Sequence, residues 1–75
     1  MTILSLPAVG RVAERRLRQH GQPMPQAELV KWLGTIDVAH ERALAGIRLA
    51  VTIGRLVDTP NGIAIPVLDE GMAAA

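Results

Sequence analysis

His40 and Glu41 form the first two residues of the HExxH pattern of zinc proteases. That chemistry needs a second histidine one helical turn later, so that both imidazoles approach the same metal ion. Position 44 holds a leucine, so the motif is absent. We therefore expect His40 to lie at the start of a helix as a surface or half-buried residue, and not to bind a metal.

Other residue types that perform catalysis are scarce. The 75-residue chain has two histidines, no cysteine, no tyrosine and no glycine-rich phosphate-binding loop. The lack of cysteine excludes disulfides and thiolate-bound metals. The acidic Asp58, Asp69 and Glu70 are expected in a turn and in the tail. We predict that the protein is not an enzyme and that it uses no metal and no cofactor.

Charge is distributed unevenly along the chain. All eight lysines and arginines precede residue 58, whereas three of the seven acidic residues lie at or beyond it. A basic first part permits a nucleic acid or an acidic protein as partner. The first residues lack the early positive charge and the long apolar run of a signal peptide, so we expect none, and the longest uncharged run contains prolines and a glycine. We expect a cytoplasmic protein that does not enter a membrane.

The length of 75 residues predicts that 1–75 form one domain, with 1–5 and 69–75 flexible. Apolar periodicity predicts that this domain begins with three helices. The first helix should span about 6–20, with Ser5 as its N-cap and Gly21 after its end. Arg11, Arg15 and Arg18 share one face of this helix. We interpret that face as a solvated surface, with a phosphate-contacting stripe as the alternative.

The second and third helices are delimited by prolines and glycines. Pro25 should open a short helix over 26–33, and Gly34 should end it. The third helix is expected over 38–53, with Asp37 or else Thr35 as N-cap and Gly54 as its stop. Its inner face should carry the residues Leu44, Ile47, Val51 and Gly54, widened by Ala43, Ala50 and Ile53. Its exposed face should carry Glu41, Ala45, Arg48, Thr52 and Arg55.

Two features could serve contact with another protein. Trp32 is the only aromatic residue of the chain and is either a core residue or a partner-binding hot spot. A stripe of small residues follows the third helix, at Ala39, Ala43, Gly46 and Ala50. Such a stripe lets another helix approach closely, either within the domain or in a homodimer.

A hairpin should follow the helices. Thr59-Pro60-Asn61-Gly62 has the residue types of a tight turn, and the flanking segments 55–58 and 63–67 alternate in polarity. Ile63, Ile65 and Val67 should share one face of the second strand. Pro66 cannot donate a ladder hydrogen bond, so the strand should lie at an edge or end there.

Segments 17–34 (LRQHGQPMPQAELVKWLG) and 55–62 (RLVDTPNG) resemble the start and the wing of many small bacterial and phage regulators. These regulators are winged helix-turn-helix proteins. The resemblance implies an α+β fold, in which three helices are followed by a C-terminal β-hairpin. It also implies binding to double-stranded DNA, with the third helix in the major groove.

The resemblance further implies residue roles. Asp37, His40, Glu41 and Arg42 would lie near the bases, with Arg42 able to donate two hydrogen bonds to guanine. Arg48 and Arg55 would contact phosphates, joined by Arg11, Arg15 and Arg18.

Other functions fit the same sequence. The expected wing contains Asp58 and no basic residue, which is unfavourable next to phosphate. The alternative function is a protein-binding winged-helix module, such as a phage inhibitor or adaptor that docks through an apolar surface. A third interpretation is a subunit of a larger assembly, in which the long helix packs against a neighbour.

Overall fold

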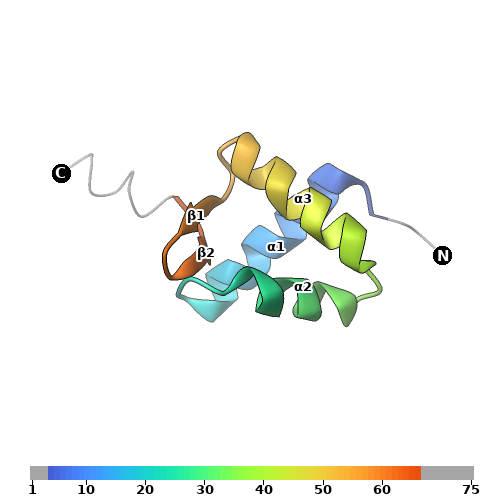
Figure 1. Ribbon diagram of the computed structural model, residues 1–75, viewed down its shortest axis with the longest axis horizontal. Helices are drawn as coiled ribbons and strands as arrows, with labels where there is room; N and C mark the ends of the chain where they lie inside the picture. The colour runs from blue at the N-terminus through green and yellow to red at the C-terminus, as the bar shows by residue number, and fades with distance from the viewer. Residues whose placement is uncertain (1–3, 67–75) are drawn as a thin grey trace.

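The computed structural model describes residues 4–66, which form three helices followed by a two-stranded antiparallel hairpin. Helix α1 spans Leu6–His20, α2 spans Gln26–Gly34 and α3 spans His40–Thr52; the strands are β1 at Val57–Thr59 and β2 at Gly62–Ala64. Figure 1 shows the hairpin at one end of the helical layer. This α+β layout is that of a winged helix-turn-helix, as predicted. The expected flexibility of 69–75 and the position of Val67 fall outside the described residues.

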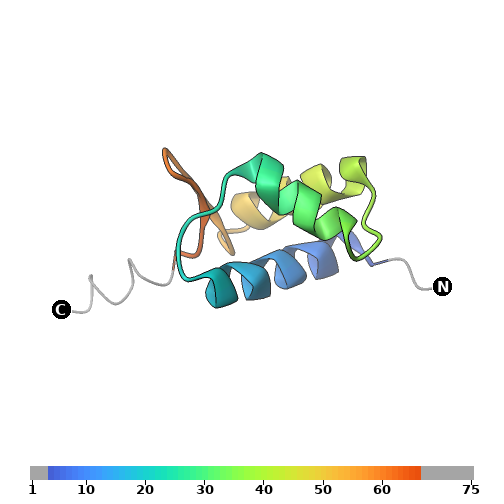
Figure 2. The same ribbon diagram turned by 90° about the horizontal axis from the view of Figure 1, so that it is seen from below.

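Helix α1 has the predicted bounds because its end signals are local. The Ser5 hydroxyl accepts a hydrogen bond from the Ala8 N–H at 3.3 Å. Gly21 adopts a left-handed φ of 81°, and its N–H donates to the Leu17 carbonyl at 2.9 Å. The core side of α1 carries Val9, Gly10, Ala13 and Leu17. Figure 2 shows α1 beneath α2 and α3.

Helix α3 differs from its predicted form at both ends. Asp37 was expected to cap it, but Asp37 has a left-handed φ of 68° within the turn after α2. The Val38 N–H donates back to the Leu33 carbonyl, and α3 begins after Ala39 without a side-chain cap. Ile53 was expected to face inward. It is 57% exposed, because the helix ends at Thr52 and the chain turns away through Gly54.

The two strands of the hairpin are shorter than predicted and directly flank the turn. Its register pairs Val57 with Ala64 and Thr59 with Gly62, so only Pro60 and Asn61 lie between the strands. The Thr59 hydroxyl donates to the Gly62 carbonyl at 2.7 Å and accepts from the Asn61 N–H at 3.1 Å. These hydrogen bonds hold the turn closed.

A contact absent from the sequence prediction joins the hairpin to the helices. Met24, in the loop between α1 and α2, exchanges two backbone hydrogen bonds with Ile63, at 3.0 and 2.8 Å. The backbone of residues 24–25 therefore passes close to Gly62, which has a φ of 125°. A Cβ at position 62 would lie 2.5 Å from the Met24 carbonyl carbon, so only glycine fits this position.

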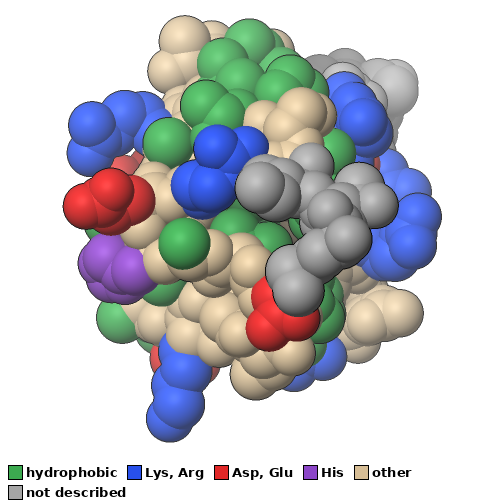
Figure 3. Space-filling view, turned by 90° about the vertical axis from the view of Figure 1, so that its right-hand side faces the viewer, with side chains coloured by type: hydrophobic (Ala, Val, Ile, Leu, Met, Phe, Trp, Pro, Cys, Tyr) green, Lys and Arg blue, Asp and Glu red, His purple; other side chains and the backbone are tan. Residues whose placement is uncertain are grey.

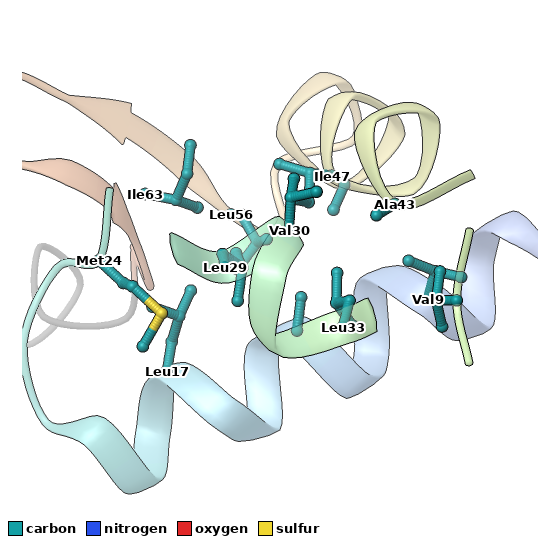
Figure 4. Packing of buried hydrophobic residues seen from close by; sticks show 13 residues of the cluster. Val9, Leu17, Met24, Leu29, Val30, Leu33, Ala43, Ile47, Leu56 and Ile63 are labelled. Atoms are coloured by element: carbon teal, nitrogen blue, oxygen red, sulfur yellow. The ribbon is translucent and has the colours of Figure 1, made fainter. Parts of the chain in front are cut away.

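The core is aliphatic and is formed by the three helices, β2 and the segments that join them. Figure 4 shows Leu29 and Leu33 of α2 between α1 and α3, while Met24 and Ile63 close the hairpin end. The buried cluster comprises Val9, Ala13, Leu17, Met24, Leu29, Val30, Leu33, Val38, Ala43, Ile47, Ala50, Leu56 and Ile63.

Helices α1 and α3 approach each other most closely around Gly46. A Cβ built on Gly46 would overlap the Val9 side chain, lying 2.6 Å from its Cβ. One turn further along α3, at Ala50, a Cβ built on Gly10 of α1 would lie 3.0 Å from the Ala50 Cβ. The small residues of the α3 stripe therefore serve packing within the domain.

We predict that Gly46→Ala lowers the free energy of unfolding by about 1–3 kcal/mol, because the β-branched Val9 cannot move aside without separating the helices. Urea denaturation measures the change. Gly34→Ala is the matched control. A Cβ there meets nothing within 4 Å, so the free energy should stay constant or rise by up to about 1 kcal/mol. Equal effects of the two substitutions would contradict the close crossing.

Candidate nucleic-acid interface

The outer face of α3 is polar along its length. Glu41, Arg48 and Thr52 are exposed at one-turn and two-turn spacings, with the half-buried Ala45 between them. His40, at the first position of the helix, is also exposed, but it lies about 100° around the helix axis from Glu41, on the side toward α2. This face lies opposite the buried Ala43, Gly46, Ile47 and Ala50. Glu41, Arg48 and Thr52 are exposed as predicted from the sequence, whereas the predicted exposure of Ala45 and Arg55 was wrong: both are half-buried, and Arg55 lies beyond the end of α3.

Arg48 is the arginine of this face whose guanidinium is available to bind a ligand. Within residues 4–66 its guanidinium forms no hydrogen bond and no ion pair. An exposed, unpaired guanidinium on a helix surface suits contact with phosphate or a base edge.

Arg42 lies differently from Arg48. It is half-buried, and its Nη2 donates a hydrogen bond to the Leu4 carbonyl, at the chain segment that leads into α1. This bond directs the guanidinium toward the start of α1 and away from the centre of the polar face. Asp37, the remaining residue expected near the bases, is exposed in the turn before α3.

A second group of arginines forms on α1. Arg11, Arg15 and Arg18 are exposed on the side of the helix opposite Val9, Ala13 and Leu17. Arg55, from the segment after α3, joins them around the carboxylate of Glu14. We call Arg11, Arg15, Arg18 and Arg55 the arginine face.

Glu14 organises the arginine face. Its Oε2 accepts from Arg18 Nη2 at 2.8 Å, and its Oε1 accepts from Arg55 Nη1 at 2.9 Å. The Glu14 side chain is 16% exposed, against 37% for Arg55 and 63% for Arg18, so the Arg55 pair is the better shielded. This pair joins the segment that follows α3 to the middle of α1.

The predicted DNA-binding residues are therefore divided between two surfaces. Glu41 and Arg48 lie on the outer face of α3, and His40 lies at the start of the helix on the side that faces α2. The arginine face follows the outer side of α1, which points away from the core. Figure 3 views one end of the molecule, where basic side chains lie near the middle and around the edge of the view without forming one patch.

The wing brings no cation to either surface. Asp58, Pro60 and Asn61 are its exposed residues. Phosphate contact by the tip of the wing would therefore depend on backbone and amide groups.

The candidate partner-binding residues are mostly engaged within the domain. Ala43, Gly46 and Ala50 are buried, so they can form a dimer seam only if α1 moves away. Ala39 is exposed. Trp32 is half-buried, and the Arg16 guanidinium lies 5.4 Å from the centre of its ring, within cation–π range.

An apolar hollow lies between α2 and the first turns of α3. It has a volume of about 430 Å³ and is lined by Gln26, Ala27, Val30, Lys31, His40 and Leu44. Its floor is aliphatic, and Lys31 and His40 stand at its border. The sequence indicated an apolar docking surface without placing it.

Metal binding and membrane insertion were not expected from the sequence, and residues 4–66 can be inspected for both. Across that range, no three residues of the types His, Cys, Asp and Glu gather in a way that could hold a metal ion. Within the same range, every helix is too short or too polar to cross a membrane.

Comparison with protein-family models, curated proteins and solved structures found no match.

Glu14 and Arg16 are the site residues that sequence reasoning did not identify. The spacing of Glu14 and Arg18, four residues apart on a helix, was a usable signal for an ion pair. No local signal pointed to the pairing of Glu14 with Arg55 or of Arg16 with Trp32, because both join segments that are distant in the chain.

We predict that Glu14→Gln lowers the free energy of unfolding by about 0.5–1 kcal/mol at low salt, because Arg18 and Arg55 lose their counter-charge. The loss should shrink in about 1 M salt, where the Debye length is about 3 Å. Urea denaturation at both salt concentrations measures it. The control Glu28→Gln removes an exposed carboxylate and should have a smaller effect. A salt-independent loss, or a stability gain, would show that Glu14 does not act through these charges.

Proposed function

We propose that this protein is a small DNA-binding regulator of the bacterial or phage type that acts in the cytoplasm and uses α3 in the major groove. The observation that carries the proposal is the polar outer face of α3, which presents Arg48 within a helix-turn-helix followed by a hairpin. An α-helix fits the width of the B-DNA major groove, and its exposed side chains then meet the base edges.

The contacts support a particular division of roles along α3. His40 and Glu41 occupy its first turn, where side chains of recognition helices contact bases. Arg48 lies two turns further and is suited to a phosphate that borders the groove. Arg42 holds the segment before α1 against α3 through the Leu4 carbonyl, so we assign it a positioning role.

The arginine face does not belong to the contact we propose. Arg11, Arg15 and Arg18 point outward from α1, and Arg55 is paired with Glu14. A duplex docked on the outer face of α3 would leave that surface uncovered.

The test is a fluorescence-anisotropy titration with random-sequence duplex DNA at several salt concentrations. The wild-type protein should bind at micromolar concentrations in low salt and lose affinity as salt rises. Arg48→Ala should weaken binding to all sequences similarly and lower the slope of log K against log salt by about 1. Arg15→Ala, which removes one arginine from α1, is the matched control and should leave both quantities unchanged. Absence of binding at low salt would refute the proposal, and equal effects of the two variants would refute the role of α3.

The apolar hollow supports a second candidate function, a module that docks an apolar segment of another protein between α2 and α3. Its aliphatic floor at Val30 and Leu44 would be covered by such a segment, whereas DNA gains little from it. Ala27→Arg separates the two functions. A cation at the rim of the hollow should tighten DNA binding in the titration above, whereas it would obstruct an apolar protein segment.

A further inference from the structure

The arginine face gathers more positive charge than the nearby acidic side chain of Glu14 can neutralise. Four guanidinium groups surround the single carboxylate of Glu14 on this surface. Arg11, Arg15 and Arg18 are exposed, and within residues 4–66 Glu14 forms ion pairs with Arg18 and Arg55 alone. Such a surface attracts anionic groups, and the function proposed for α3 does not use it.

The described chain ends beside this surface. A hollow of about 330 Å³ is lined by Arg18 and Arg55 together with Ile65 and Pro66, the last described residue. Ile53 and Glu14 also border it. The hollow therefore has an apolar part next to Pro66 and a cationic part toward α1.

The residues that follow Pro66 have a matching order. Val67 and Leu68 are apolar, and Asp69 and Glu70 are acidic. The apolar pair would meet the part of the hollow formed by Ile53 and Ile65. The acidic pair would then reach the guanidinium groups beyond it.

The length of this segment is sufficient. An extended chain covers about 3.3–3.6 Å per residue, so Asp69 and Glu70 can reach roughly 10–14 Å from Pro66. Arg11 and Arg18 are separated along α1 by about 10 Å at 1.5 Å per residue. Both carboxylates can therefore reach arginines of the face without any change in the helices.

We propose that the segment 67–70 docks on the arginine face, with Val67 and Leu68 on the apolar part of the hollow and the carboxylates of Asp69 and Glu70 paired with its arginines. Because the segment is tethered at Pro66, its effective concentration at the face is high even though each exposed ion pair is weak. The docked segment shields the arginines from phosphate and other anions. High salt releases it, because screening weakens the ion pairs.

A spin-label experiment tests this docking in the absence of DNA, so its result is independent of the function proposed for α3. The chain has no cysteine, so Ala73→Cys gives a single attachment site for a nitroxide. At low salt the label should broaden the amide NMR signals of Arg11 and Arg15, which lie one to two turns along α1 from Arg18. The broadening should weaken by at least about twofold in about 1 M salt.

Neutralising the acidic pair gives the decisive comparison. In the labelled Asp69→Asn/Glu70→Gln variant, the low-salt broadening at Arg11 and Arg15 should also fall by at least about twofold, because the ion pairs are lost. The matched control Glu28→Gln/Glu41→Gln removes the same charge from α2 and α3 and should leave the broadening unchanged. Equal broadening in the neutralised and control proteins, or none in the wild-type chain, would overturn the proposal.

Discussion

The close contact between Val9 of α1 and Gly46 of α3 fixes how these two helices cross. It brings two helices together at a distance that leaves no room for a side chain at position 46. Once this crossing is set, Leu29 and Leu33 of α2 fill the remaining space of the core. The crossing also decides which side of each helix faces outward, and so it separates the arginines of α1 from the polar face of α3.

The order and nature of the elements could be predicted because their signals are local. Ser5 and Gly21 delimit α1 through contacts within one turn, and the Thr59–Gly62 turn determines the hairpin. The sequence-based predictions were wrong or incomplete where contacts between distant segments outweigh the local conformational preference of a residue. Asp37 adopts a left-handed turn conformation because the chain after α2 folds back on Leu33, which leaves no cap for α3. The pairing of Met24 with Ile63 joins two segments that lack any shared sequence signal.

The sequence was sufficient to name most residues of the candidate site, but it predicted only part of how these residues are arranged in space. Helical spacing placed Arg11, Arg15 and Arg18 together on an exposed face, and it exposed Glu41 and Arg48 on α3. Spacing within one helix gives no information about partners elsewhere in the chain. The bond from Arg42 to Leu4 and the pair between Arg55 and Glu14 therefore emerged only in three dimensions. Both bonds engage arginines that the family resemblance would assign to DNA, which leaves Arg48 as the free cation of α3 within residues 4–66.

We propose that the outer face of α3 contacts DNA, and an NMR titration of isotope-labelled protein with a random-sequence duplex at low salt would test this contact. We expect the largest amide shift changes on His40, Glu41, Ala45 and Arg48, with the amides of Arg11 and Arg15 little affected. Changes that centre on α1, or on Val30 and Leu44 in the apolar hollow, would contradict it, as would a spectrum that DNA leaves unchanged.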